Sequence, residues 1–248
     1  MPNTQHIVAP SERVLQILAC VARQGQAVSV RELVEQTGLP LSTVYRHLNA
    51  LKKWGWVQEH ARSGLYEPGP LAVPLAHGFD QHSWLMQTAR PGIEQLAERS
   101  GESVGLLCYL HGQVVCLDMV ESPRGLASSF AKGRVNATIR GATAKALLAF
   151  LPPVLQQQVM DQYLAEAGNE RTALEFELQR IRHCRYAISE HEVDRGVWGV
   201  SAPVFSGRRQ LIATLSLMTS SERASGRQQD YINLTLTAAD RISRRLQD

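Results

Sequence analysis

The chain has 248 residues, of which 44% are hydrophobic and 20% are charged, and its formal net charge is +3. This composition is typical of a globular chain with one large or two modest domains, and it excludes an intrinsically disordered protein. The longest apolar neighbourhood, residues 142–155, contains Lys145 and two prolines, so the sequence predicts no membrane-spanning segment. Because the first ten residues lack the basic-then-apolar pattern of an export signal, we expect a flexible arm on a cytoplasmic protein.

Two short helices joined by a tight turn are predicted next. Apolar residues on one face indicate a helix over residues 31–37, and Gly38 stands where a helix end favours a left-handed residue. Pro40 blocks continuation, and Ser42 is expected to cap a second helix that runs through Trp54. In a helix-turn-helix motif, this second helix enters the major groove of DNA.

A short β-hairpin is predicted directly after the second helix. Residues 56–58 and 65–67 are strand-like, and they enclose a turn that contains Arg62. Upstream, apolar residues at helical spacing predict a first helix over residues 12–24. Three helices followed by a hairpin indicate a winged helix, in which Arg62 can reach a phosphate or the minor groove.

The outer face of the second helix carries the side chains predicted to contact DNA. Those expected to face the bases, because they lie in the first turns, are Thr43, Tyr45 and Arg46. Those expected to contact phosphates are Ser42, Lys52, Lys53 and Arg62. Residues 42–62 contain four basic residues and one acidic residue, so this short stretch carries +3, as much as the whole chain. The alternative is an ordinary helical hairpin whose charges are only solvated.

Beyond this region the sequence predicts a linker and then alternating strands and helices. Residues 71–83 have a weak apolar stripe broken at Pro74 and are interpreted as a partly helical linker, whereas the helix over 84–100 is expected to kink or restart at Pro91. The predicted strands are residues 104–110, 114–120, 127–131, 186–189, 197–205 and 210–218, with turns at 111–112 and 206–208. The other predicted helices are residues 141–151, 154–166, 173–184 and 227–246. This pattern predicts an α+β fold with helices packed on an antiparallel sheet.

Metal, redox and catalytic sites have weaker support. Neighbouring residues on a strand face opposite ways, so Glu190, His191 and Glu192 cannot all share a metal ion, and no metal site is predicted. Cys108 and Cys116 could face each other across the predicted hairpin as a redox pair, although buried strand cysteines more often serve packing. The sequence has no GxSxG motif, so we expect neither an enzyme nor a cofactor.

The order of these features resembles the IclR family of bacterial transcription regulators over nearly the whole chain. The matching segments are TGLPLSTVYRHLNAL, GESVGLL, GATAKALLAFLP, CRYAISEHEVDRGVWGVSAPVF and the closing helix. The resemblance implies a winged helix-turn-helix, a linker helix and an effector-binding domain of GAF-like topology. The expected divisions are a flexible arm at residues 1–10, a DNA-binding domain at 11–71, a linker helix at 72–90 and an effector-binding and oligomerisation domain at 91–248.

The resemblance also implies a site for a small-molecule effector, between one edge of the sheet and the loop before the Ala-rich helix. Matched position by position, the effector contacts would be Asn136, Ala142, Thr143, Ser189, Val197, Gly199, Ser216 and Met218, with Ser128 at the rim. Unpaired N–H groups at the start of that helix suit a carboxylate, so we expect an organic acid as the effector. The alternative is that these residues are simply domain interior.

The chain departs from the family pattern around this site. Ala144 replaces the usual glycine of the Ala-rich helix, and the proline and histidine usual ahead of it are absent. Ser189 stands where an acidic residue is common, and the pair that follows is His191-Glu192 instead of two glutamates. The loss of an acid beside Arg140 favours an anionic effector, unless Arg140 points to solvent.

These features together predict a ligand-responsive transcription regulator, a repressor rather than an activator, that binds duplex operator DNA. The resemblance implies a dimer or tetramer that controls a catabolic operon for a carbon source or a small organic acid. Effector binding would shift the linker and so the spacing of the two DNA-binding domains, which must match the half-sites. The alternatives are a metabolite-binding module whose winged helix mediates protein contacts and an enzyme acting on the same metabolite.

Overall fold

The computed structural model describes all residues except 1–8, 127, 137, 165–167, 208–209 and 248. The predicted arm therefore lies almost wholly outside the described residues. The chain divides into two compact units, Met1–Ser83 and Trp84–Asp248. No helix in the described part of the chain is long and apolar enough to cross a membrane.

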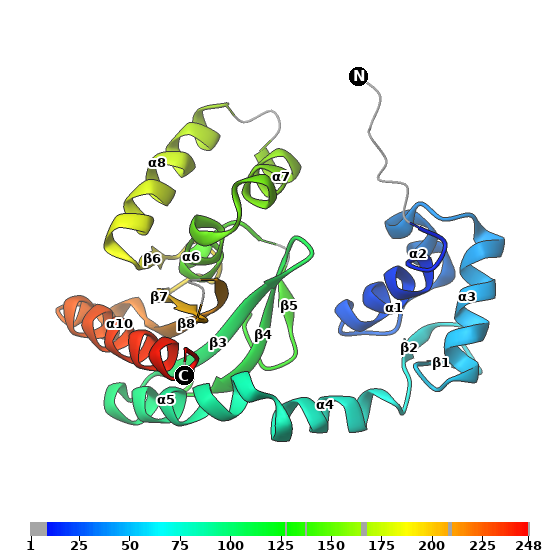
Figure 1. The fold of residues 1–248 in the computed structure, drawn as a ribbon, viewed down its shortest axis with the longest axis horizontal. Coiled ribbons are helices and arrows are strands. Elements are labelled where there is room, and N and C mark those ends of the chain that lie inside the picture. Colours follow the sequence, from blue (N-terminus) through cyan, green and yellow to red (C-terminus); the bar gives the residue numbers. More distant parts are fainter. Residues whose placement is uncertain (1–8, 127, 137, 165–167, 208–209, 248) are drawn as a thin grey trace. The chain divides into compact units, whose positions relative to one another are not determined.

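The first unit contains the predicted winged helix (Figure 1). Its elements are α1 (Arg13–Arg23), α2 (Val30–Thr37), α3 (Leu41–Lys53), β1 (Val57–Glu59), β2 (Tyr66–Pro68) and α4 (Ala72–His82). The three helices meet at Ile17, Leu33 and Leu48, which are fully buried, and β1 and β2 form an antiparallel hairpin. The predicted helix-turn-helix and the hairpin after it are confirmed.

Local signals define both ends of α2. The Ser29 hydroxyl accepts a hydrogen bond from the Glu32 N–H (3.2 Å), and the Glu32 carboxylate accepts one from the Ser29 N–H (2.8 Å). This reciprocal arrangement is a capping box, which pairs two backbone donors that the helix leaves free. Gly38 ends the helix at φ +67°, the left-handed conformation predicted for it.

The start of α3 differs from the prediction at Ser42. The helix begins one residue earlier, at Leu41, and Pro40 is the capping residue. The Pro40 carbonyl accepts hydrogen bonds from the N–H groups of Thr43 (2.9 Å) and Val44 (3.0 Å). Proline suits this place because its φ is fixed and its missing N–H is not needed before a helix starts. Ser42 is therefore an exposed residue of the first turn instead of the cap.

The exit from the wing is tied to the end of α3 by backbone contacts. The Gly69 N–H donates to the Trp56 carbonyl (2.8 Å), and the Leu71 N–H donates to the Gly55 carbonyl (3.1 Å). A Cβ atom on residue 69 would overlap the Gly55 carbonyl, so this close approach requires glycine.

The linker is a regular helix, α4, and the predicted break at Pro74 is wrong. Pro74 is the third residue of α4, where a backbone N–H has no partner within the helix, so the proline ring removes no hydrogen bond. No residue of α4 is buried, and Val73, Leu75 and Phe79 are exposed.

The second unit is a layered α+β domain. Its elements are α5 (Trp84–Ser100), β3 (Ser103–Leu110), β4 (Gln113–Val120), β5 (Val135–Asn136), α6 (Gly141–Phe150), α7 (Pro153–Leu164), α8 (Gly168–Cys184), β6 (Ala187–Glu190), β7 (Val197–Phe205), β8 (Leu211–Ser220), α9 (Ser221–Ala224) and α10 (Gln228–Arg245). The antiparallel sheet has the order β5-β4-β3-β8-β7-β6. Helices α5 and α10 cover one face, and α6 with α7 and α8 covers the other (Figure 1). The predicted fold is confirmed.

Alternation along β7 and β8 separates a packing face from a polar face. Trp198, Val200 and Leu215 belong to the apolar core under α5 and α10. Because successive strand residues point to opposite faces, Ser201 and Ser216 point towards α6. The polar face is therefore the one that the start of α6 covers.

Several predicted elements of this unit need correction. Residues 128–131 form no strand (Ala127 lies outside the described part), and the edge strand next to β4 is β5. The Ser129 N–H and hydroxyl donate to Asp194, and Ser129 has no place in a strand ladder. Helix α5 continues through Pro91 without restarting, and α8 begins at Gly168, earlier than predicted. The predicted ends of α7 and of the 206–208 turn fall on residues outside the described part.

The alternative that Cys108 and Cys116 form a redox pair, which the sequence made less favoured than packing, does not hold. Cys108 pairs with Val115 and Cys116 pairs with Leu107, on adjacent rungs of the β3–β4 ladder. Adjacent rungs point to opposite faces of a sheet, so the two thiols do not face each other.

Candidate functional site

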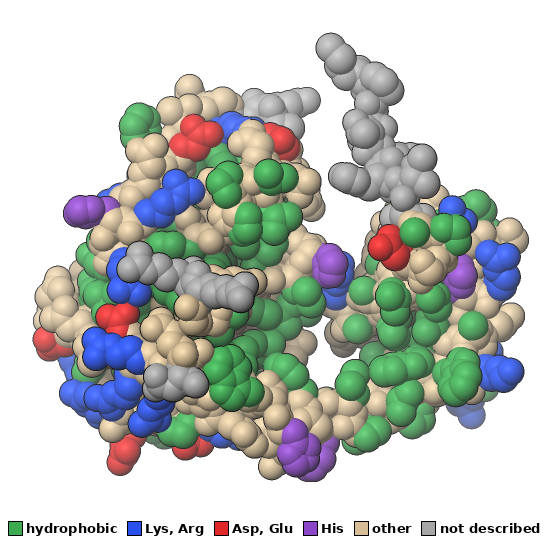
Figure 2. All heavy atoms as spheres, viewed as in Figure 1, with side chains coloured by type: hydrophobic (Ala, Val, Ile, Leu, Met, Phe, Trp, Pro, Cys, Tyr) green, Lys and Arg blue, Asp and Glu red, His purple; other side chains and the backbone are tan. Residues whose placement is uncertain are grey.

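Helix α3 presents one continuous face to solvent. Its inner residues Val44, Leu48 and Leu51 are buried in the core of the winged helix. On the outer side Tyr45 is 46% exposed and Arg46 is exposed. Figure 2 shows separate Lys and Arg side chains along the edge of the molecule where α3 lies. This face offers polar and basic groups from the first turns of the helix to its end.

The basic groups near α3 differ in how free they are. Arg46, Lys53 and Arg62 are exposed and form no ion pair within the described residues. Lys52, in contrast, pairs with Glu59 of β1 and lies 5.9 Å from the centre of the Tyr66 ring. The hydrogen bond to Glu59 raises the pKa of Lys52. Among the described residues, three of these side chains are therefore available to a phosphate without breaking an ion pair, whereas Lys52 would have to leave Glu59.

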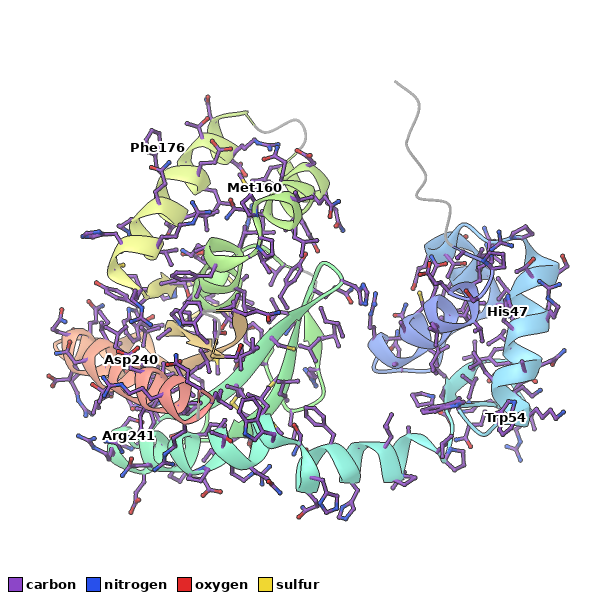
Figure 3. The ribbon with its side chains drawn as sticks, in the orientation of Figure 1. His47, Trp54, Met160, Phe176, Asp240 and Arg241 are labelled. Atoms are coloured by element: carbon purple, nitrogen blue, oxygen red, sulfur yellow. The ribbon has the colours of Figure 1, made fainter. Side chains whose placement is uncertain are left out.

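His47 lies on the side of α3 that faces α1 (Figure 3). Its Nε2 atom is buried and has no hydrogen-bond partner in the described part of the chain. Burial, followed by the charges of Arg46 and Arg13, lowers the pKa of His47. The uncharged imidazole is thus the form that this packing favours.

A small cavity lies in the second unit, between the start of α6 and the polar face of β7 and β8. Its volume is about 30 Å³, which is room for about one water molecule. Its lining residues are Ser128, Phe130, Gly141, Ala142, Thr143, Ser189, Glu192, Val193, Asp194, Val197, Gly199, Ser201 and Met218.

The first N–H groups of α6 have no partner within the helix, and two of them donate to side chains instead. The Gly141 N–H donates to Glu192 Oε2 (2.9 Å), and the Ala142 N–H donates to Ser189 Oγ (2.9 Å). Gly141 has φ +87°, and a Cβ atom there would lie 2.7 Å from Val193 Cγ2. Only glycine permits this turn of the chain against Val193.

Three hydroxyl groups form a closed triangle beneath the cavity. Thr143 Oγ1 lies 3.2 Å from Ser201 Oγ and 3.0 Å from Ser216 Oγ, and the two serine oxygens lie 2.7 Å apart. All three side chains are buried. Each hydroxyl can rotate its proton, so the triangle can offer a donor or an acceptor to a molecule above it.

One buried cation stands beside the start of α6. The side chain of Lys145 is 5% exposed, and its ammonium group bonds to Glu177 of α8 (2.8 Å) and to Glu192 (2.7 Å). Glu192 therefore uses one oxygen on Lys145 and the other on Gly141. Asp194 lies two residues further on. Its carboxylate accepts hydrogen bonds from the Ser129 N–H (2.8 Å) and from the Ser129 hydroxyl.

Comparison with known proteins identifies both units. The model of the IclR C-terminal domain of bacterial transcriptional regulators matches residues 80–244, and that of the IclR helix-turn-helix domain matches residues 11–61. The chain belongs to the IclR family of bacterial transcriptional regulators. It is a ligand-responsive, DNA-binding transcription regulator.

Relatives in this IclR family align over most of their length. The chain is 27% identical to the uncharacterized HTH-type transcriptional regulator RhmR of Escherichia coli, over 94% of this chain and 92% of RhmR. It is 25% identical to the transcriptional repressor IclR of the same organism, over 83% of this chain and 77% of IclR. An IclR homologue from Microbacterium hydrocarbonoxydans, solved in complex with 4-hydroxybenzoate, has the same fold, with a TM-score of 0.72, 20% identity and coverage of 96% and 99%.

Most of the side chains implied by the IclR resemblance lie together in the structure. Those that line the cavity are Ser128, Ala142, Thr143, Ser189, Val197, Gly199 and Met218. Ser216 does not line the cavity, but its hydroxyl bonds to Thr143, which does. Asn136 lies on β5, away from the lining, and its side-chain amide is 3.5 Å from the Ser129 carbonyl. Arg140 is exposed and lines a different hollow, on the outer side of Glu192.

The sequence reasoning missed six lining residues of this cavity, and three of them are successive: Glu192, Val193 and Asp194. The other three are Phe130, Gly141 and Ser201. The three successive residues belong to the loop between β6 and β7, and each contacts the cavity or its rim. The one sequence signal for the three successive residues is that they follow the strand of Ser189, which does not give the direction of a loop side chain. Among the described residues, no three His, Cys, Asp or Glu side chains gather into a group that could hold a metal ion.

Proposed function

We propose that this regulator represses a catabolic operon by binding an operator through α3 and that a small organic acid, bound between α6 and the sheet, releases it. The observation that carries the DNA-binding part is the exposed outer face of α3, with Arg46 free of any ion pair among the described residues. Repression is supported by similarity to the E. coli protein named transcriptional repressor IclR. The site of action would be the cytoplasm.

In this proposal the residues of the winged helix have separate roles. Thr43, Tyr45 and Arg46 read bases because they lie in the first turns of α3, which a helix-turn-helix directs into the major groove. The phosphate contacts are Ser42, Lys52, Lys53 and Arg62. Lys52 would exchange Glu59 for a phosphate, so its contribution would be smaller than that of Lys53.

Self-association as a dimer or tetramer is part of the proposal. Helix α4 buries none of its residues, while Val73 is 72% and Leu75 60% exposed. Apolar side chains left in water on a regular helix favour contact with a second copy of the chain. A dimer would present two copies of α3 to a near-palindromic operator.

An organic acid is the proposed effector because the start of α6 binds carboxylates within this chain. Its N–H groups are held by Glu192 and Ser189, beside the buried ammonium of Lys145. A helix N-terminus next to a cation favours an anion. The 4-hydroxybenzoate bound by the Microbacterium protein is itself a carboxylate.

The test of the DNA-binding proposal is footprinting on the DNA that flanks the gene, with wild type and Arg46→Ala in parallel. We expect a protected, near-palindromic site, and a loss of about 1–3 kcal/mol in binding free energy for the variant on that site alone. Lys53→Ala is the matched control, because losing a phosphate contact weakens binding to all sequences alike. Equal losses on operator and random DNA for Arg46→Ala would contradict its base-reading role, and no protection at low salt would contradict the proposal.

A further inference from the structure

The loop between β6 and β7 (residues 191–196) places a carboxylate where an effector carboxylate is expected. Glu192 Oε2 accepts the Gly141 N–H (2.9 Å), and Glu192 Oε1 accepts from the Lys145 ammonium (2.7 Å). These are the two strongest groups for an anion at this end of α6, a backbone donor at a helix start and a buried cation. Both are already occupied from within the chain.

We propose that Glu192 is an internal competitor of the effector and that it makes the site selective for anions. An effector enters by displacing the Glu192 carboxylate and placing its own carboxylate on Gly141 and Lys145. This inference rests on the proposed function of the cavity, and it adds the residue that decides which chemical class of molecule is admitted.

Glu192 also forms the wall between two spaces. It lines the inner cavity of about 30 Å³ and an outer hollow of about 440 Å³ between α6 and α8. Its side chain is 33% exposed, whereas Lys145 behind it is 5% exposed. Rotation of Glu192 towards solvent would therefore open the small cavity to the larger hollow without moving a fully buried group. The present cavity admits little more than one water molecule, so a metabolite needs this opening.

Charge balance explains why a neutral molecule cannot take the place of Glu192. When Glu192 leaves, the Gly141 N–H loses its acceptor and the buried Lys145 keeps only Glu177. A buried donor without a partner and a buried charge with fewer partners are both unfavourable. A carboxylate restores both interactions, whereas an uncharged amide or alcohol can accept hydrogen bonds but restores no negative charge beside Lys145.

The rest of the loop holds the closed arrangement. Val193 packs against Gly141, and Asp194 bonds to Ser129 across the cavity mouth. His191, with φ +59°, turns the chain and accepts the Gly196 N–H on Nδ1 (2.9 Å). Glu192 thus lies on a short loop that is held by an internal hydrogen bond. Its displacement would move the neighbouring residues His191 and Val193.

The experiment measures binding of the smallest suitable probe, acetate, to the full-length protein labelled with [15N]glycine. The amide signal of Gly141 is followed during titration with sodium acetate, and with acetamide as the uncharged probe of the same shape, at constant ionic strength. In wild type we expect a weak, saturable shift with acetate and none with acetamide. In Glu192→Gln we expect the acetate Kd to fall about tenfold, because a neutral amide holds Gly141 and Lys145 less strongly than a carboxylate does.

Glu190→Gln is the matched control. Glu190 lies two residues away, and its carboxylate pairs with His191 rather than with Gly141 or Lys145. The control has the same charge change as Glu192→Gln, so we expect its acetate Kd to equal that of wild type. Should Glu192→Gln fail to fold, Glu192→Asp retains the charge on a shorter side chain and should also lower the acetate Kd.

An unchanged or higher acetate Kd in the Glu192 variants would overturn the proposal, as would equal binding of acetamide and acetate. An equal fall in Glu190→Gln would assign the effect to general charge and overturn it as well. Absence of any acetate shift at Gly141 in all proteins would have the same meaning. Footprinting with Glu192→Gln separates these outcomes from failure of the proposed function, because operator protection reports the DNA-binding part on its own.

Discussion

The winged helix and the cavity beside α6 assemble their side chains in different ways. Thr43, Tyr45 and Arg46 of the winged helix lie within one turn of a single helix. In the cavity, Gly141 bonds to Glu192, 51 residues away, and Thr143 bonds to Ser216, 73 residues away. A surface built from one helix tolerates changes in its side chains as long as the helix remains. A cavity built from distant segments depends on the register of the whole sheet, so changes far from it can disturb it.

The largest loss of stability is expected from a substitution of Glu102, in the second unit, where contacts distant in sequence are predicted to matter most. Its carboxylate is fully buried and accepts from Arg223 of α9 (3.0 Å) and from the Tyr231 hydroxyl of α10 (3.2 Å). Glu102→Ala should reduce the free energy of unfolding of this unit by about 3 kcal/mol, because the buried Tyr231 hydroxyl and the half-buried Arg223 guanidinium lose their acceptor. Hydrogen exchange of the Val200 and Leu215 amides measures the loss.

Glu102→Gln serves as the control, since its amide oxygen still accepts hydrogen bonds and its loss should be smaller. A loss below about 1 kcal/mol for Glu102→Ala would mean that distant contacts do not hold this unit together.

A smaller effect is expected from a local change in the winged helix. Ser29→Ala removes half of the capping box of α2 and should cost about 1 kcal/mol of the unfolding free energy of that unit. Hydrogen exchange of the Leu33 amide reports it. Ser63→Ala, at an exposed residue of the wing turn, should leave that exchange unchanged. Equal effects of the two variants would contradict a local origin for the stability of α2.

The change in the stability of the winged helix with pH should be smaller than the loss from Ser29→Ala. The pKa of His47 is lowered from its ordinary value near 6.5 in the folded state, so the unfolded chain binds more protons below that pH. Stability from the uncharged His47 is complete above about pH 6.5 and declines as pH falls towards the folded pKa. Hydrogen exchange of the Leu48 amide between pH 7.5 and 5 measures the decline, after correction for intrinsic exchange rates.

His47→Gln should remove this pH dependence, and His77→Gln, at an exposed residue of α4, should retain it. A slope that survives in His47→Gln would assign the pH response to another group.

No reaction is expected between the sheet cysteines of the native protein and an alkylating reagent. Burial raises the pKa of Cys116 to about 12 and that of Cys108 to about 11. At pH 8 only about one Cys116 thiol in ten thousand would be the reactive thiolate. Alkylation by iodoacetamide, followed by mass spectrometry, should leave both residues unmodified in the native protein and modify both in urea. Rapid labelling of the native protein would contradict the burial of this ladder.

Sequence reasoning succeeded where neighbouring residues determine the structure. Gly38 indicated its own left-handed conformation, and the apolar spacing of Val44, Leu48 and Leu51 indicated which side of α3 is buried. It failed at Ser42 because Pro40, two residues earlier, also suits the cap position. The helix used the proline carbonyl.

The cavity could be predicted only in part, for the same physical reason. Matching the family pattern found the residues on strands and at the start of α6, where position along the chain defines the direction of a side chain. It did not find Glu192, because a loop residue acquires its place from contacts with Gly141 and Lys145, which are distant in sequence. The predicted strand at 127–131 failed likewise, since Ser129 bonds to Asp194, 65 residues away.

The contact between Gly55 and Gly69 has a mechanical consequence for the DNA-binding unit. Two backbone hydrogen bonds, from Gly69 to Trp56 and from Leu71 to Gly55, join the end of α3 to the start of α4. The backbones approach so closely that a Cβ atom on residue 69 would overlap the Gly55 carbonyl. A rotation of α4 would therefore be passed to α3 through these two hydrogen bonds, and it would change the angle at which α3 meets the major groove.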